Sequence, residues 1–361
     1  DVIEIIGMSC RFPGSITDLY GPCVAYDTAH SSSLVALNAT VSALKNGECE
    51  LALVAGVNKL FDPQDFLAFS AVNMLSPTGR CHTWDSAADG YLRGEGCGAI
   101  VLKRDDYVNP SNSYASILAT NVAHDGSKGT ITAPNGFAQQ RLIQKTLAKA
   151  NITSNEVDYI EAHGTGTPLG DTAEVDALAG VFAPSRCIEH PLLVGSVKSN
   201  IGHLEWAAGM AGLIKAVLVL QHELVPPNVA LKSLNPIIDK IVQSQQFPVQ
   251  FPTDLMPLRL LSAKGIAKPL IAGVSSFGFS GTIAHTVIMQ TYRNKSLSSL
   301  ETGQDSAINC INKMFPKRYK IPWTSLSTSL LSQVYHVGKT LTALNTKELQ
   351  SNPSTVNTQD K

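Results

Sequence analysis

The sequence predicts an α/β fold, and three observations support this. Apolar runs of strand length alternate with longer segments that carry apolar residues at helical spacing, from residue 24 to residue 290. Several of the short runs are apolar throughout, as in strands that are buried on both faces of a sheet. Hydrophobic residues make up 44% of the 361 residues, which is enough to bury a large core. Alternating units of this kind form sheets with helices packed on them.

The first element is a short strand followed by a turn, within residues 1–14. The next elements are expected to be a strand at 24–27, a helix at 31–45, and strands at 51–56 and 99–102. A second series follows, with a helix at 138–150, a strand at 157–160, a helix after Asp171, a strand at 192–195, a long apolar helix at 207–220, and strands at 271–274 and 284–289. Residues 291–361 are rich in Ser, Thr, Asn and Lys, which is typical of a linker or flexible tail.

Charge and composition exclude several functions. The formal net charge is −1 and there is no long basic run, so neither nucleic acid nor an anionic membrane is an expected partner. We find no apolar run long enough to cross a bilayer and no signal-peptide pattern at the first residues. The seven cysteines are scattered without paired spacing, which predicts neither a disulfide framework nor a metal site. The expected location is therefore cytoplasmic.

Two histidines stand in glycine-rich turns, each placed between a predicted strand and a predicted helix. His163 begins the segment H-G-T-G-T-P-L-G-D, and His203 ends the segment N-I-G-H. Glycines allow close approach of a substrate to the backbone, and an imidazole held in such a turn can exchange hydrogen bonds or protons with that substrate. A single histidine of this kind is more often a turn cap. Two of them predict a catalytic site.

These motifs resemble those of the β-ketoacyl synthase (ketosynthase) domain of type I polyketide synthases and fatty acid synthases. Three other segments carry the same resemblance, namely D-T-A-H-S-S-S at 27–33, D-S-A-A-D-G-Y-L-R-G-E-G at 85–96 and G-V-S-S-F-G-F-S-G-T at 273–282. The similarity runs from about Gly21 to about Gln290. It implies a thiolase-like fold, a five-layered αβαβα sandwich.

The resemblance also divides the chain. Residues 1–14 resemble the first strand of the family, 21–110 the remainder of its N-terminal half and 111–290 its C-terminal half, with 291–361 as linker or tail. In the family, much of the N-terminal half lies between the landmarks that end here at Gly14 and begin again at Gly21. The chain is therefore expected to be an N-terminally truncated ketosynthase, with an incomplete N-terminal half.

By resemblance, five residues form the catalytic group. His30 occupies the position of the family's nucleophilic cysteine, at the start of a helix whose N-terminus favours an anion. His163 and His203 match the two histidines that bind the extender thioester oxygen and assist decarboxylation. Lys198 and Glu174 are supporting residues, which we expect to form an ion pair.

The glycine-rich segment near residue 278 supplies the remaining site residues. The backbone N–H of Phe279 would form an oxyanion hole with the N–H of the nucleophile position, and the rings of Phe277 and Phe279 would gate the acyl pocket. The charged residues of 85–96 are expected to form structural hydrogen bonds rather than catalytic ones.

The family reaction is a decarboxylative Claisen condensation of acyl and malonyl thioesters. The implied partners are an acyl carrier protein with its phosphopantetheine arm, an acyltransferase and other synthase domains, with a homodimer in the intact family. No cofactor is expected to bind directly. His30 could accept an acyl group, but an acyl-imidazole is far more labile to water than a thioester, so condensation should be impaired. Two alternatives remain, a malonyl-thioester decarboxylase and a non-catalytic dimerisation remnant.

Overall fold

The computed structural model of the chain describes residues 3–9, 21–104, 113–126, 133–261 and 268–291. Within these ranges strands and helices alternate along the sequence, which confirms the predicted α/β class. None of the helices in this part of the chain combines the length and the apolar character needed to cross a bilayer.

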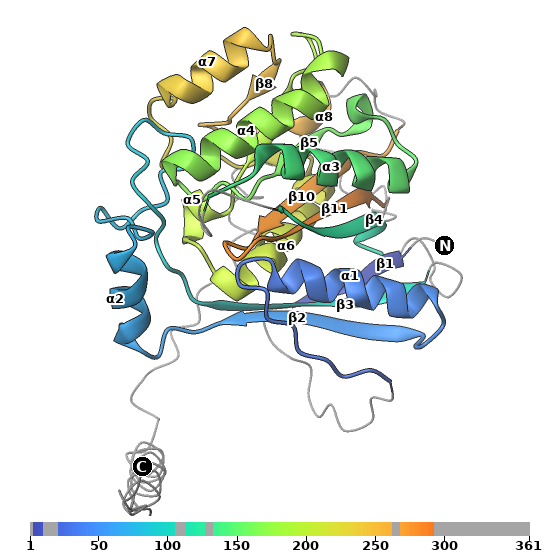
Figure 1. Ribbon diagram of the computed structural model, residues 1–361. Coiled ribbons are helices and arrows are strands. Elements are labelled where there is room, and N and C mark those ends of the chain that lie inside the picture. Colours follow the sequence, from blue (N-terminus) through green and yellow to red (C-terminus); the bar gives the residue numbers. More distant parts are fainter. Residues whose placement is uncertain (1–2, 10–20, 105–112, 127–132, 262–267, 292–361) are drawn as a thin grey trace, which may run out of the picture. The chain divides into compact units, whose positions relative to one another are not determined.

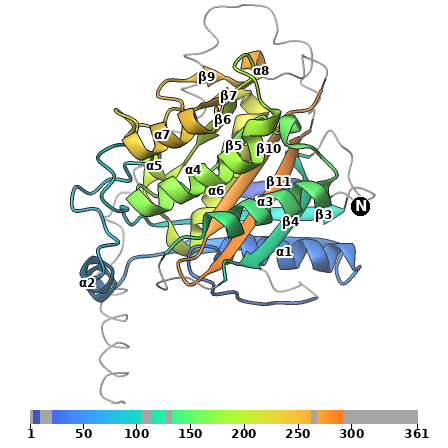
Figure 2. The same ribbon diagram turned by 45° about the horizontal axis from the view of Figure 1, so that its top comes forward.

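A nine-stranded mixed sheet organises the described residues (Figures 1 and 2). β1 (Ile3–Ser9) lies inside it, antiparallel to β3 (Gly96–Arg104) on one side and to β4 (Ala115–His124) on the other. The edge strand β2 (Leu51–Asn58) lies beyond β3. Beyond β4 the order is β11 (Thr282–Gln290), β10 (Ile271–Phe277), β5 (Tyr159–Glu161), β6 (Leu192–Gly195) and β8 (Val249–Gln250). A small second sheet pairs β7 (Leu224–Val225) with β9 (Met256–Pro257).

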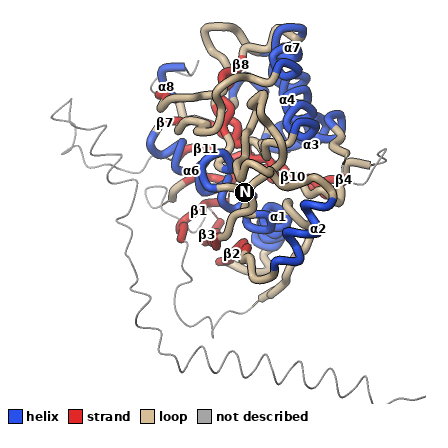
Figure 3. The backbone as a smooth tube through the Cα atoms, turned by 90° about the vertical axis from the view of Figure 1, so that its left-hand side faces the viewer, coloured by secondary structure: helices blue, strands red, loops and turns tan. Residues whose placement is uncertain are grey.

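Helices cover both faces of the strands from β4 to β6. On one face α3 (Gly136–Ala150) packs beside α4 (Pro168–Phe182), with α7 (Pro236–Ser244) next to α4, and Figure 3 shows the three along one side of the strands. On the other face α1 (Ser32–Lys45) and α6 (Ala208–His222) lie between those strands and the layer of β2, β3 and β1 (Figure 1). The shorter helices are α2 (Pro63–Ala71), α5 (Lys198–Ile201), α8 (Leu258–Leu261) and the 3-10 turns η3 (Ser154–Glu156), η4 (Ala183–Ser185) and η5 (Glu205–Ala207).

The central helices α1 and α6 are stabilised by apolar residues that pack between β2 and β3 on one side and β4 and β10 on the other. α1 buries Leu34, Leu37 and Leu44, and α6 buries Leu213 and Leu220, all with no exposed surface. Each fully buried leucine contributes roughly 1.5–3 kcal/mol relative to an exposed one. This apolar layer fixes the two helices, and the turns that enter them carry two of the predicted site histidines.

In the described residues, α3 and α4 lie on one side of the strands from β4 to β6, and α1 and α6 lie between those strands and β2, β3 and β1. The outer face of β2 is not covered by a helix of this part of the chain, and its Leu51 and Val57 side chains are 49% and 61% exposed. The expected incompleteness of the N-terminal half stays a prediction. The expected linker at 291–361 lies, except for residue 291, outside the described residues.

The strand expected at residues 24–27 is absent. These four residues form no regular element, and Val24 is 61% exposed. The run is mostly apolar, but no strand in the described part of the chain pairs with it. The helix expected after Asp171 begins earlier, at Pro168, because proline is well suited to the first turn of a helix.

Candidate active site

His30 lies in a tight turn that leads into α1. Ala29 adopts a left-handed conformation with φ +54°, which is unfavourable for a residue other than glycine. Two side chains stabilise the turn, since the Ser31 hydroxyl donates to the Thr28 carbonyl over 2.9 Å and the Ser32 hydroxyl donates to the Ala29 carbonyl over 2.6 Å. The result places the His30 side chain, only 4% exposed, at the N-terminal end of the helix.

His163 follows β5, and its turn is built on a buried carboxylate. The backbone N–H groups of His163 and Gly164 each donate to the Glu174 carboxylate over 2.8 Å. Gly164 has φ +37°, and a Cβ atom there would lie 2.8 Å from the Ser196 Cβ, so only glycine fits. The imidazole lies against the Phe277 ring, and the Phe277 N–H donates to its Nδ1 atom over 3.3 Å.

His203 follows α5 and is completely buried. Its backbone N–H donates to the Leu92 carbonyl over 2.7 Å, and its Nδ1 atom accepts the Glu205 N–H over 2.8 Å. The Nε2 atom has no hydrogen-bond partner among the described residues. A buried polar atom without a partner is costly in a folded protein, which marks this nitrogen as a candidate for contact with a ligand.

The fold brings the three histidines together. One ring nitrogen from each lies within 4.8 Å of the other two. The His30 ring centroid is 4.3 Å from that of His203 and 6.4 Å from that of His163, and the Phe279 ring lies 5.3 Å from His30. The residues that resemblance grouped from positions 30, 163, 203 and 279 therefore form one cluster.

A cavity of about 280 Å³ opens onto this cluster, with His30, His163, Phe277 and Phe279 in its wall. His203 is not among the lining residues. Because the His30 ring packs directly against it, we infer that the imidazole at position 30 separates His203 from the cavity.

All three imidazoles are neutral near pH 7. Burial lowers the pKa of His30 to about 3, with smaller contributions from Lys198 and Arg93. Burial also lowers the pKa of His163 and of His203 well below 6.5, assisted by the neighbouring cationic and imidazole groups. Neutral imidazoles can each offer one N–H and one lone pair to a ligand.

The backbone contacts determine which nitrogen carries the proton. A backbone N–H only donates, so Nδ1 of His163 and Nδ1 of His203 must be acceptors, and the hydrogen of each neutral ring is on Nε2. Three clustered histidines resemble a zinc site, but a cation needs a lone pair rather than an N–H on the atom that faces it. The cluster is therefore suited to an oxygen acceptor, not to a metal ion.

Lys198 and Glu174 are both buried, and their charges attract each other. No salt bridge joins their side chains in the described part of the chain, where the Glu174 carboxylate accepts the N–H groups of His163 and Gly164. Burial raises the pKa of Glu174 to about 7 and lowers that of Lys198. Asp171 was missed by sequence reasoning, although its carboxylate accepts the N–H groups of Trp84, Thr165 and Gly166.

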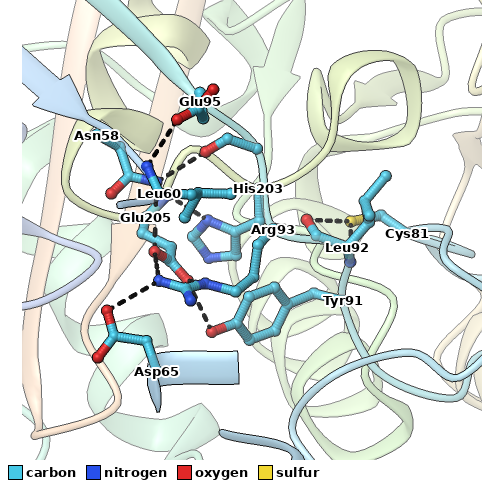
Figure 4. Close-up of polar contacts among 11 residues, drawn as sticks. Asn58, Leu60, Asp65, Cys81, Tyr91, Leu92, Arg93, Glu95, His203 and Glu205 are labelled. Carbon is cyan, nitrogen blue, oxygen red and sulfur yellow. Dashed lines mark hydrogen bonds and ion pairs between the residues drawn. The ribbon is translucent and has the colours of Figure 1, made fainter. Parts of the chain in front are cut away.

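A buried ion pair lies behind His203 (Figure 4). Arg93 and Glu205 come from segments 112 residues apart, and two of their nitrogen–oxygen pairs are 2.7 Å and 2.9 Å apart. The Tyr91 hydroxyl also donates to Glu205, over 3.2 Å. The expectation of structural hydrogen bonds for residues 85–96 included Arg93, but Glu205 was not singled out from the sequence.

Comparison with known proteins shows the family. The model of the β-ketoacyl synthase N-terminal domain matches residues 16–107, and that of its C-terminal domain matches residues 114–232. The chain belongs to the β-ketoacyl synthase family. It is 45% identical over 281 residues to a phenolphthiocerol/phthiocerol polyketide synthase polypeptide of Mycobacterium bovis, covering 76% of this chain and 14% of that protein. It is 42% identical over 315 residues to the hybrid PKS-NRPS synthetase pynA of Aspergillus niger, and the match covers 86% of this chain and 7% of that protein.

Solved structures give the same result and confirm the thiolase-like fold. The oxazolomycin ketosynthase domain OzmH KS7 of Streptomyces albus superimposes with a TM-score of 0.71 at 37% identity, covering 76% of this chain and 47% of that structure. The ketosynthase from module 6 of the bacillaene synthase of Bacillus subtilis superimposes with a TM-score of 0.67 at 36% identity, and the match covers 74% of this chain and 47% of that structure. The chain thus matches about half of a solved ketosynthase and a small part of the curated synthases.

Proposed function

We propose that this chain is the ketosynthase region of a polyketide or fatty acid synthase and that its site binds acyl and malonyl thioesters. The observation that carries the proposal is the cluster of His30, His163 and His203 beside the cavity. The backbone N–H groups of His30 and Phe279 donate to no acceptor in the described ranges, so they are available to a thioester oxygen. The substrate would arrive on the phosphopantetheine arm of an acyl carrier protein.

The histidine pair supports the decarboxylation half of the family reaction. When a malonyl thioester loses carbon dioxide, negative charge develops on the thioester oxygen as the enolate forms. An Nε2–H group from His163, and one from His203 once the substrate reaches it, would donate hydrogen bonds to that oxygen. Such donors act most strongly in a site from which water is excluded.

Condensation also requires a nucleophile that holds the acyl group. His30 has no thiol, and an acyl group on its imidazole would be hydrolysed rather than stored. The sequence therefore favours a second candidate function, the decarboxylation of malonyl thioesters without condensation.

The test is to give the purified chain an acyl thioester and a malonyl thioester of pantetheine and to measure both carbon dioxide and β-ketoacyl product. The expected result is carbon dioxide without condensation product for the natural sequence, and formation of the product by the His30→Cys variant. The control is a variant in which His163 and His203 are both replaced by alanine. Release of carbon dioxide no faster than with this control would refute the proposal.

The same proposal implies partners beyond the chain itself. An acyltransferase would load the extender, and other synthase domains would process the product, because the matched relatives are long multifunctional synthases. Pairing of two copies, as in the intact family, and a cytoplasmic location belong to this proposal as expectations. Gel filtration with light scattering would test the pairing.

A further inference from the structure

We propose that Glu205 and Arg93 are positioning residues for His203, because their buried ion pair holds the turn that sets the hydrogen-bonding state of the His203 ring. The inference rests on the proposed function only where it concerns catalysis. Its structural part concerns which ring nitrogen of His203 carries the proton and is independent of any activity.

The backbone of Glu205 is strained. Its φ is +42°, a left-handed conformation that costs a residue other than glycine or asparagine roughly 1–2 kcal/mol. Glu205 opens the 3-10 turn η5, directly after the segment that carries His203. Such a conformation persists only where the surrounding contacts impose it.

The side chain of Glu205 supplies those contacts. Its Oε1 accepts from Nε of Arg93 over 2.7 Å and from the Tyr91 hydroxyl over 3.2 Å. Its Oε2 accepts from Nη2 of Arg93 over 2.9 Å and from Nδ2 of Asn58 over 3.2 Å. Figure 4 shows this set of donors around one carboxylate, which has no exposed surface. With both oxygens occupied by donors, the carboxylate is fixed in position.

Two backbone contacts transmit this position to His203. The Leu92 carbonyl accepts the His203 N–H over 2.7 Å, and the Gly94 N–H donates to the His203 carbonyl over 2.8 Å. The segment that carries Arg93 therefore runs alongside His203. From the other side, the Glu205 N–H donates to Nδ1 over 2.8 Å. The segments of Arg93 and Glu205 thus hold His203 from two sides and orient its ring.

The left-handed turn is what directs the Glu205 N–H at the ring. A relaxed turn would direct it elsewhere, and Nδ1 would no longer be obliged to accept a hydrogen bond. The neutral ring could then move its proton from Nε2 to Nδ1 and lose the donor that faces His30 and the site. The ion pair acts on the reaction through His203 and touches no substrate.

The contact of Arg93 with Asp65 offers a control for the proposed positioning role of Arg93 and Glu205. Nη2 of Arg93 also lies 3.4 Å from the Asp65 carboxylate of α2, whose side chain is 56% exposed. Because the Asp65 carboxylate is more than half exposed and the contact is long, Asp65→Asn should leave the buried contacts of Arg93 intact. Glu205→Gln has the same shape as glutamate but places an NH₂ group where Arg93 already presents a donor.

The experiment uses the full chain labelled with ¹⁵N-histidine, with the His203 signals assigned by comparison with His203→Gln. In the natural sequence and in Asp65→Asn, the spectra should show the proton of His203 on Nε2. In Glu205→Gln, and in Arg93→Lys, which retains the charge but loses the two-pronged contact, the Nδ1–H form should become populated. If Glu205→Gln does not fold, the position of the His203 proton in Arg93→Lys decides whether the proposal holds. Folded variants with the proton still on Nε2 would overturn the proposal.

Activity provides a second, separate measurement. For carbon dioxide release from a malonyl thioester, kcat should fall at least about tenfold in Glu205→Gln, with KM nearly unchanged, because a displaced catalytic group affects the transition state more than binding. An unchanged kcat in a variant whose tautomer has shifted would overturn the catalytic part. Absence of turnover in the natural chain would count against the proposed function, while the spectra would still judge the structural part.

Discussion

Gly278 packs so closely against Thr28 that a Cβ atom at position 278 would lie 2.4 Å from the Thr28 carbonyl oxygen. The two residues belong to the two segments that carry Phe279 and His30. A second contact joins these segments, since the Ser276 hydroxyl donates to the His30 carbonyl over 2.6 Å. The loop and the turn are thus fitted to each other through their backbones.

Replacement of Gly278 by alanine should therefore force the loop away from the turn. Because the carbonyl cannot rotate aside as a side chain would, the expected loss of stability is about 3 kcal/mol, the upper end for overpacking. The difference in the free energy of unfolding between Gly278→Ala and the natural sequence can be measured by urea unfolding. Gly47→Ala is the control, because a Cβ atom there meets nothing within 4 Å and its φ of +73° accounts for only about 1–2 kcal/mol. Equal losses in the two variants would show that the contact is not tight.

His285 should make the chain less stable in acid. Its Nδ1 lies 2.9 Å from the Ser275 hydroxyl inside the sheet, and burial lowers its pKa from 6.5 to about 3. A lowered folded pKa means that the stabilisation is complete above pH 6.5 and decreases as the pH falls, since only the unfolded chain takes up the proton. Between pH 7 and pH 5 this residue alone should account for about 2 kcal/mol.

The variant His285→Gln isolates that contribution. Its loss of unfolding free energy between pH 7 and pH 5 should be smaller than that of the natural sequence by the stated amount, with His30, His163 and His203 contributing equally to both. Ser275→Ala removes the same hydrogen bond but retains the imidazole, so its pH dependence should match the natural sequence. Identical pH dependence in all three chains would contradict the assignment.

Cys81 should resist alkylation in the folded chain. Its sulfur accepts the Leu92 N–H over 3.2 Å, its side chain is 2% exposed, and burial raises its pKa to about 11. At pH 8 only about one thiol in a thousand would be ionised, and the thiolate is the reactive form. Mass spectrometry after iodoacetamide treatment should find Cys23 and Cys187, both exposed, modified long before Cys81. In denaturant the three should react alike, and rapid native modification of Cys81 would disprove its burial.

The clustered histidines should not bind zinc tightly. Two of the three rings accept backbone N–H groups at Nδ1, and metal binding through Nε2 would leave those N–H groups facing an N–H on the ring. Equilibrium dialysis of the natural chain and of His203→Ala should give the same zinc content. One equivalent bound by the natural chain and lost in the variant would show that the rings adopt the opposite tautomer.

Local patterns were sufficient for much of this fold. The helix expected at 31–45 appears as α1 at Ser32–Lys45, because its apolar residues recur at helical spacing and face the core. The strand expected at 192–195 appears as β6 with the same bounds. β4 was not expected, since Ser116 and Thr120 interrupt its apolar pattern, although both residues are buried in the fold.

The residues of the site could be predicted, but the contacts between them could not. Resemblance placed His30, His163 and His203, and the fold brings them together. The contact of Arg93 with Glu205 could not be predicted, because no local spacing relates two segments that meet only in the folded chain. The expected pairing of Lys198 with Glu174 stays a prediction, because their charges attract each other but the described hydrogen bonds of the carboxylate come from backbone N–H groups.

The place of β1 in the sheet has a consequence for biosynthesis. Ile3 pairs with Arg104 on one side and with Ile117 on the other. Because both partners come much later in the sequence, β1 leaves the ribosome long before the two strands that it pairs with. Until they follow, an apolar segment with two unpaired edges is exposed to other chains and to chaperones. During this interval β1 is open to mispairing, and a holdase that binds extended apolar segments should capture the nascent chain there.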